Sequence, residues 1–152
     1  MTRTRGNALN PKHEARNKFQ VRNSNVENVD QSSGENDKSR FDLEDRTYEF
    51  ARRVRAFVKF LPRTICNIED VKQLVRSSGS VGSNYIEAND SLGRKDFLMR
   101  IRICRKESKE SRYWLRLVDT RNDETLEKER CTLTNEAEQL MKIFGAILRN
   151  SE

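Results

Sequence analysis

The sequence is poor in residues that break helices, since its 152 residues include two prolines and six glycines. Proline and glycine are the residues least compatible with a helix interior, so their scarcity in a highly charged chain favours helices. No apolar run approaches the roughly 18 to 20 residues that span a bilayer, and the N-terminus lacks the apolar stretch of a secretory signal. We therefore expect a cytoplasmic protein that does not enter the membrane.

Cysteine and histidine are also scarce. The cysteines Cys66, Cys104 and Cys131 are odd in number and show no Cys-x-x-Cys spacing, which is typical of reduced thiols in a cytosol. The one histidine, His13, lies near the N-terminus, so the sequence has no Glu-x-x-His pairs for a di-iron bundle and no histidine base for a nucleophile in the core. It also lacks a glycine-rich phosphate-binding motif. We expect no metal, no cofactor and no enzymatic activity.

Charge is what the sequence has in excess. Charged residues make up 36% of the chain and hydrophobic residues 34%, whereas an average globular protein has about 25% charged residues. Lysine and arginine number 30 against 24 acidic residues, which gives a formal charge of +6 and an isoelectric point of about 9.4. A chain of this length forms one domain, and its positive charge fits an anionic partner without identifying one.

Residues 1–40 differ in amino-acid composition from the rest of the chain. Apolar side chains appear there only as scattered points, and such a segment buries too little area to offset its ordering entropy. We expect a disordered basic tail and linker over 1–40 and a folded domain over 41–152. The tail either binds a polyanion or is a solvated extension without a role. Its positive charges include Arg3, Arg5, Lys12, Arg16, Lys18 and Arg22.

Helical periodicity begins after residue 40 and divides into four segments. The first spans about 43–61 and is ended by Pro62, and the second follows Asn67, the expected N-cap, to about residue 88. The third spans about 94–120, and the fourth follows a turn at 120–123. Four amphipathic helices with short connections predict an all-α, antiparallel up-down-up-down four-helix bundle. The apolar seam of the fourth helix is Leu133, Ala137, Leu140, Phe144 and Ile147.

The third segment has the most regular pattern. Its core residues alternate at spacings of four and three, as in a helix bundle. The centre of this seam is small, so a neighbouring backbone can approach closely, and the natural partner is the small-residue run 77–83 in the second helix. Gly79 and Gly82 in that run predict either a kink or very close packing. The seam comprises Phe97, Ile101, Cys104, Ser108, Ser111, Leu115 and Val118.

One flank of the third helix combines apolar side chains with two carboxylates, at the same spacing. Such a flank packs on another helix or on another subunit, with the glutamates paired to an arginine, because an unpaired buried charge is costly. A polar rim within one bundle is the alternative. The residues are Ile103, Glu107, Glu110, Trp114 and Leu117, and the expected oligomer contact is made by Ile103, Trp114 and Leu117.

The opposite flank is a basic ridge. Its positive charges recur at spacings of four and three and suit a phosphate backbone, whose binding would weaken with salt. The alternative is a solvated charged face, since acidic residues are plentiful elsewhere. Arginines of the first helix would broaden the patch if that helix lay alongside. The candidate nucleic-acid-binding residues are Arg94, Arg105, Lys109, Arg112 and Arg116.

Two stretches, 76–90 and 95–118, resemble a known protein family. In the second helix the matching residues are Ser80, Val81, Asn84, Glu87 and Ala88, and in the third they are Lys106, Glu107, Glu110, Tyr113, Trp114 and Leu115. The chain from about Phe41 onward is similar to the four-helix-bundle family encoded in intervening sequences of bacterial 23S ribosomal RNA genes. The resemblance implies an antiparallel bundle that assembles as a ring, expected to be a homopentamer. The family includes accessory proteins of diversity-generating retroelements, which associate with a reverse transcriptase and nucleic acid.

The shared polar residues are interpreted first as structural. We expect Arg76, Asn84, Glu87, Glu107 and Glu110 to form a buried, hydrogen-bonded network between helices, with a binding role as the alternative. Three hypotheses remain for the whole chain. It is a homo-oligomer that binds RNA or DNA through basic surfaces, an accessory scaffold for a reverse transcriptase or another enzyme, or a self-assembling bundle without further activity.

Overall fold

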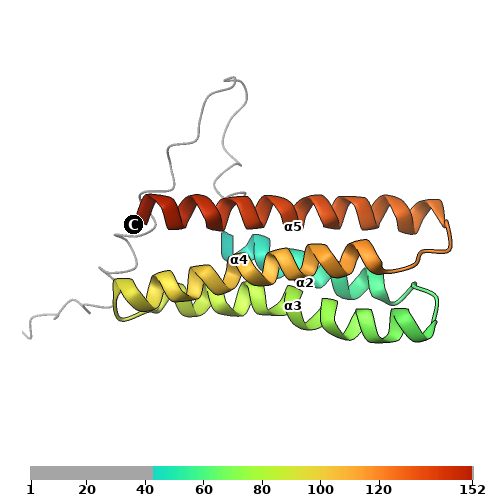
Figure 1. The fold of residues 1–152 in the computed structure, drawn as a ribbon, viewed down its shortest axis with the longest axis horizontal. Coiled ribbons are helices and arrows are strands. Elements are labelled where there is room, and N and C mark those ends of the chain that lie inside the picture. The colour runs from blue at the N-terminus through green and yellow to red at the C-terminus, as the bar shows by residue number, and fades with distance from the viewer. Residues whose placement is uncertain (1–42, 152) are drawn as a thin grey trace, which may run out of the picture. The chain divides into compact units, whose positions relative to one another are not determined.

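Four helices account for most of the residues that the structure describes. The structure is a computed structural model, and it describes residues 43–151, so the expected tail lies outside the described residues. The helices are α2 (Leu43–Val58), α3 (Ile65–Asn89), α4 (Arg94–Leu117) and α5 (Glu124–Ser151). Consecutive helices run in opposite directions (Figure 1). The prediction of an all-α, up-down-up-down four-helix bundle is therefore confirmed.

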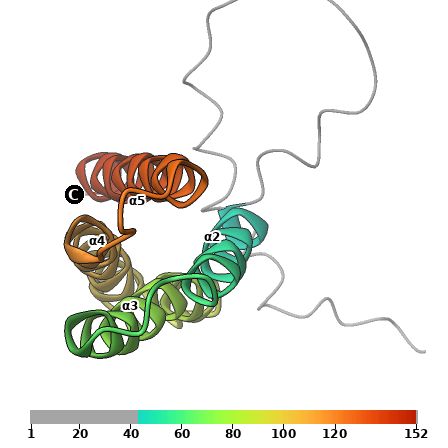
Figure 2. The same ribbon diagram turned by 90° about the vertical axis from the view of Figure 1, so that its right-hand side faces the viewer.

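The helices surround a common core in the order α2, α3, α4, α5 (Figure 2). The closest pairs are α3 with α4 and α4 with α5, whereas the shorter α2 packs mainly on α3 and less on α5. The predicted seams of α4 and α5 are buried along their whole length, including the fully buried Ile101, Leu115, Leu140 and Phe144. α4 therefore lies between two long helices and presents only its flanks to the surface.

The ends of two helices differ by a few residues from those predicted. α2 ends at Val58, three residues before its expected end, and the chain turns through hydrogen bonds from Phe60 N to Phe57 O and from Leu61 N to Val58 O. α4 ends at Leu117, because Val118 leaves the helical region at φ −59° and ψ 134°. Leu61 and Val118 remain buried although they lie outside the helices, so the apolar pattern continues past each helix end.

The predicted N-cap of α3 was wrong. Thr64 caps the helix, and its hydroxyl accepts a hydrogen bond from Asn67 N at 3.1 Å. Asn67 lies inside the first turn and is buried. Its Nδ2 donates to Pro62 O and to Asp119 O, both at 2.9 Å, and its Oδ1 accepts from Asp119 N at 2.8 Å. Asn67 therefore joins the α2–α3 loop to the start of the α4–α5 loop.

The small residues of α3 serve close packing on two sides. Toward α4, the hydroxyls of Ser77 and Ser111 share a hydrogen bond of 2.9 Å, and Cys104 Sγ donates to Val81 O at 3.4 Å. Toward α2, a Cβ on Gly82 would lie 3.2 Å from Thr47 Oγ1, tighter than ordinary contact. α3 is unbroken at its glycines, so close packing, here against α2, explains Gly82.

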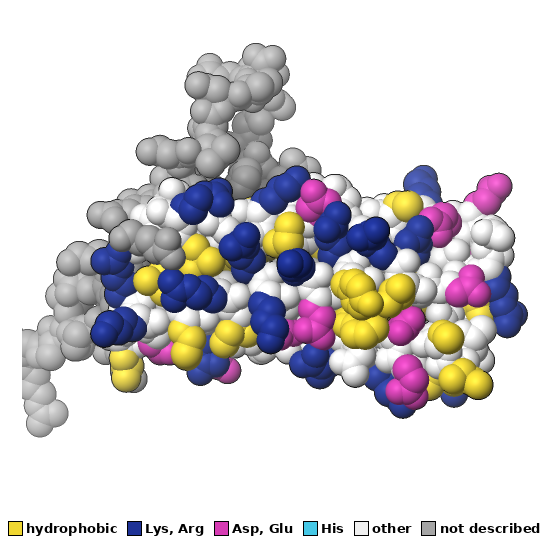
Figure 3. Space-filling view, in the orientation of Figure 1, with side chains coloured by type: hydrophobic (Ala, Val, Ile, Leu, Met, Phe, Trp, Pro, Cys, Tyr) yellow, Lys and Arg dark blue, Asp and Glu magenta, His cyan; other side chains and the backbone are white. Residues whose placement is uncertain are grey.

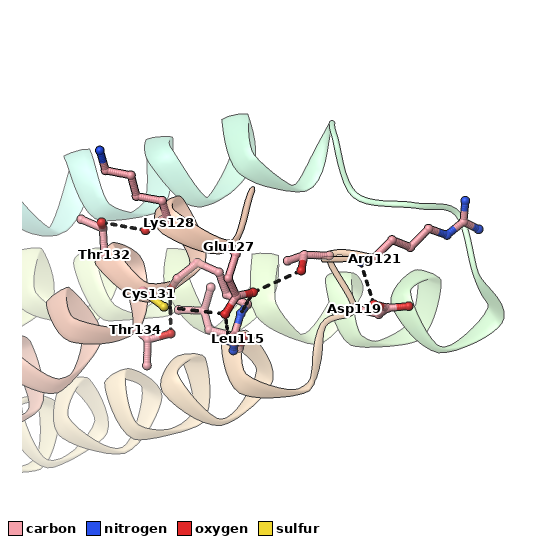
Figure 4. Close-up of polar contacts among 10 residues, drawn as sticks. Leu115, Asp119, Arg121, Glu127, Lys128, Cys131, Thr132 and Thr134 are labelled. Carbon is pink, nitrogen blue, oxygen red and sulfur yellow. Dashed lines mark hydrogen bonds and ion pairs between the residues drawn. The ribbon is translucent and has the colours of Figure 1, made fainter. Parts of the chain in front are cut away.

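Polar contacts hold the turn between α4 and α5 (Figure 4). The Glu127 carboxylate accepts hydrogen bonds from Thr120 Oγ1 at 3.1 Å and from the Arg130 guanidinium, whose Nε lies 2.8 Å away. Arg130 Nη1 also donates to Leu115 O at 3.4 Å, at the end of α4. The hydrogen bond from Arg130, above all, lowers the pKa of Glu127 to about 2. This carboxylate thus links the last turn of α4 to the first turn of α5.

Candidate nucleic-acid interface

Basic side chains gather on the surface formed by α4 and α5 (Figure 3). Arg105, Lys109 and Arg116 of the predicted ridge are exposed, and Arg112 is half-buried. Neither Lys109 nor Arg116 has an ion-pair partner within residues 43–151. These two side chains are therefore free to meet an anion.

Arg112 interrupts the ridge because it meets an acidic residue of α5. Its Nε lies 3.4 Å from Glu138 Oε2, and Lys142 Nζ lies 2.9 Å from Glu138 Oε1. The hydrogen bond from Lys142, followed by the charges of Lys142 and Arg112, lowers the pKa of Glu138. Part of the positive charge of Arg112 is thus balanced within the bundle. Spacing along α4 alone could not reveal a carboxylate on another helix.

Arg94 and Arg105 also lie against α5. Arg94 Nε donates to Ser151 O at 2.9 Å, which satisfies a carbonyl in the last turn of α5. Arg105 packs over Gly145, where a Cβ would lie 3.5 Å from its Nε and 3.5 Å from Arg149 Nη1. Arg149 is a residue of this basic surface that the sequence analysis did not identify. It lies about one turn after Gly145 in the fourth helix, and this spacing could have indicated that the two residues share a face. The basic surface therefore follows the α4–α5 seam and includes side chains of both helices.

The first-helix arginines do not broaden this surface. Arg46 pairs with Glu136 at 2.6 Å and Arg53 with Glu129 at 2.8 Å, both across to α5. Arg52 pairs with Glu49 within α2, at 2.7 Å. We give the name seam surface to four positive side chains along the α4–α5 seam: Arg105, Lys109, Arg116 and Arg149.

The other flank of α4 exposes apolar area. Ile103 and Trp114 are half-buried, and Leu117 is 48% exposed. The Trp114 ring packs edge-on against exposed Tyr113, with centroids 5.0 Å apart, and its Nε1 donates to Glu110 Oε1 at 3.4 Å. A cluster of hydrophobic side chains is visible on the same face of the molecule as the basic residues (Figure 3).

The predicted polar network divides into two clusters between α3 and α4, and it is not buried throughout, because Arg76 and Glu87 are exposed. In one, Arg76 Nη2 donates to Glu110 Oε1 at 2.5 Å. In the other, Arg100 Nη1 lies 2.5 Å from Glu87 Oε2 and 3.3 Å from Asn84 Oδ1. Arg100 thus holds together two of the family-like residues of α3.

Glu107 joins neither cluster by a hydrogen bond. Its side chain is buried, and within residues 43–151 its Oε2 has no hydrogen-bond partner. Burial, and then the nearby Glu110 charge, raises the pKa of Glu107, whereas the charge of Arg76 acts in the opposite direction. A buried carboxylate oxygen without a donor is costly. The flank that contains Trp114 therefore includes a buried carboxylate oxygen with no donor among the described residues.

The described residues contain neither a metal-binding cluster nor a membrane-spanning helix. No group of three or more histidine, cysteine, aspartate or glutamate side chains within 43–151 is arranged to hold a metal ion. None of the helices in this part of the chain is both long enough and apolar enough to cross a membrane.

Comparison with known proteins shows the family to which the chain belongs. The family model described as 23S rRNA-intervening sequence protein matches residues 40–146. The chain belongs to this family. A crystal structure from Bacteroides thetaiotaomicron, of a protein of unknown function in the S23 ribosomal protein family, is 29% identical with a TM-score of 0.59. The match covers 69% of the present chain and 96% of that protein. No match was found among curated proteins.

Proposed function

We propose that this member of the 23S rRNA-intervening sequence protein family is a non-catalytic, cytoplasmic homo-oligomer that binds RNA. The observation that carries the proposal is the seam surface, where exposed Arg105, Lys109 and Arg116 have no ion-pair partner in the described part of the chain. Most other arginines of α2 and α3 are paired with carboxylates. Phosphate contacts of this kind give affinity that depends on salt and little on sequence.

Charge reversal tests the placement of the site. The variant carries Arg105→Glu, Lys109→Glu and Arg116→Glu, and a control carries Lys59→Glu, Arg63→Glu and Lys72→Glu, the same charge change in the α2–α3 loop and on α3. Fluorescence anisotropy with labelled single-stranded RNA, repeated at several salt concentrations, reports affinity and salt slope. We expect the first variant to lose at least tenfold in affinity and about 2 units of salt slope, and the control to lose much less.

Equal losses in both variants would mean that net charge alone governs binding, and unchanged binding in the first would remove the site from α4. DNA of the same sequence, measured in parallel, separates a preference for RNA from general phosphate binding. Far-UV circular dichroism confirms that both variants retain the helical fold.

We further propose that the flank of Ile103, Trp114 and Leu117 contacts another copy of the chain. Its support is the combination of exposed apolar area with the unpartnered, buried Oε2 of Glu107. A donor from a second subunit would satisfy that oxygen and cover Leu117 at once. A ring of five subunits is the assembly we propose, and light scattering of the purified protein tests it.

The same apolar flank supports a second candidate, an accessory scaffold for a reverse transcriptase or another enzyme. Tyr113, Trp114 and Leu117 form the kind of aromatic and aliphatic patch that anchors protein interfaces. A protein that comes free of nucleic acid and forms a stable complex with a reverse transcriptase on gel filtration would favour this role. Ultraviolet absorbance at two wavelengths on fresh material distinguishes the two candidates.

A further inference from the structure

Two guanidinium groups converge over a buried glycine where α4 meets α5. Gly145 faces α4, and the point where a Cβ would stand lies 3.5 Å from both Arg105 Nε and Arg149 Nη1. The two nitrogens therefore lie no more than about 7 Å apart, a separation at which like charges repel. Arg105 comes from α4 and Arg149 from α5, so the packing of two helices brings them together.

Within residues 43–151, no carboxylate is paired with either arginine. Residues 139–151 of α5 contain no aspartate or glutamate. Glu138 lies almost two turns before Gly145 and is engaged by Arg112 and Lys142. On the facing part of α4, Asp96 lies 3.8 Å from Arg100 Nε. Arg105 and Arg149 have no ion-pair partner among the described residues.

We propose that Arg105 and Arg149 clamp one phosphate group above Gly145. Guanidinium forks match phosphate oxygens in pairs, and two forks from different directions can hold one tetrahedral anion. Gly145 has no side chain of its own to compete for the two guanidinium groups. The inference rests on the proposed function for its main ligand, a backbone phosphate of RNA, and the same chemistry fits a free phosphate.

Arg149 has another favourable interaction, which the test must separate from anion binding. It lies in the last turn of α5, where a cation is stabilised by the helix dipole. That effect would explain Arg149 alone. It does not explain why Arg105 of another helix lies beside it.

The substitution Gly145→Glu supplies a carboxylate in place of the phosphate. The matched control is Gly145→Ala, because a Cβ at 3.5 Å makes only ordinary contact with both arginines. We expect Gly145→Glu to lose at least tenfold in RNA affinity and to reduce the salt slope by about 0.7, the change for one single-strand phosphate. We expect Gly145→Ala to bind as the unmodified protein does and to melt at a lower temperature than Gly145→Glu.

RNA affinity that is the same in Gly145→Glu and Gly145→Ala would overturn the clamp on RNA. A third variant, Arg149→Gln, keeps Gly145 and is expected to lose several-fold in RNA affinity, so the test does not depend on one substitution. Unchanged binding in Arg149→Gln would equally contradict the proposal.

Inorganic phosphate separates this inference from the proposed function. If the unmodified protein fails to bind RNA, titration with phosphate is followed through the NMR signals of the arginine Nε–Hε groups. Shifts of the Arg105 and Arg149 signals that disappear in Gly145→Glu would retain the clamp as a free-phosphate site while the RNA proposal falls. No shift with phosphate and no RNA binding would refute both.

Discussion

At the scale of the single residue, Glu127 shows how one carboxylate makes the stability of the α4–α5 turn depend on pH. Its pKa is lowered to about 2, chiefly by the hydrogen bond from Arg130, whereas the ordinary value is 4.5. A carboxyl group whose pKa is lower in the folded state stabilises that state above its unfolded pKa. The contribution of Glu127 is therefore complete above about pH 4.5 and is lost as the pH falls toward 2.

Glu127→Gln should remove this dependence. The amide keeps the shape of the side chain but does not titrate, so the loss of stability between pH 5 and pH 2 should be smaller than in the unmodified protein. The urea midpoint of unfolding, followed by circular dichroism at half-unit steps of pH, measures it. Glu124→Gln, an exposed residue in the same turn of α5, is the control and should leave the profile nearly unchanged. Identical profiles for all three proteins would contradict the role of Glu127.

Asn67 marks a limit of local sequence reasoning at this scale. An asparagine ahead of two acidic residues has the pattern of a helix N-cap, but its carboxamide bonds to Asp119, 52 residues later. Thr64 takes the capping position instead. Local spacing predicts local hydrogen bonds, and it holds no information about a partner in another loop.

At the scale of the helix, the predicted core seams were largely right. The seam of α4 from Phe97 to Leu115 and that of α5 from Leu133 to Ile147 are buried as expected, because each depends only on helical spacing. The two glycines of α3 were harder to interpret. Their sequence context favoured a kink and close packing equally, and only the position of α2, whose Arg55 and Thr47 lie against Gly79 and Gly82, decides between them.

Two glycines in the bundle should respond to alanine in opposite ways. At Gly82 a Cβ would lie 3.2 Å from the hydroxyl of Thr47, which is fully buried and tied to Glu44 O at 2.9 Å. Overpacking should outweigh the gain in helix propensity, so Gly82→Ala should destabilise the protein by about 1–3 kcal/mol. At Gly145 the contact is ordinary, and Gly145→Ala should stabilise by up to about 1 kcal/mol. Urea unfolding of both variants tests the pair, and stabilisation by both would contradict close packing of α2.

The candidate site was predicted only in part, for a related reason. A basic ridge along α4 follows from spacing within one helix, and its exposed members are where that spacing places them. The partners of Arg112 and Arg105 belong to α5, so neither the neutralising Glu138 nor the neighbouring Arg149 could be inferred from α4 alone. Charge balance across a seam becomes visible only when the two helices are aligned.

At the scale of the whole molecule, the exposed flank of α4 predicts a dependence of assembly on Leu117. This side chain is 48% exposed beside Trp114, so a charge there should prevent burial against a second subunit without disturbing the core. Leu117→Glu should shift the mass measured by sedimentation toward the 17.9 kDa of one chain. Leu92→Glu is the control, since Leu92 is 93% exposed in the α3–α4 loop. Unchanged assembly in Leu117→Glu would place the interface elsewhere.

The carboxamide of Asn67 makes the two ends of the molecule unequal. It pins the helical hairpin of α2 and α3 to that of α4 and α5 at the loops where each hairpin turns. At the opposite end, where Arg94 meets the last turn of α5, the short α3–α4 loop, residues 90–93, joins the two hairpins through the chain itself. Gly145 and Arg149 lie near that opposite end, so each end of the bundle is held by a different kind of link, and the proposed phosphate clamp lies away from the Asn67 hydrogen bonds.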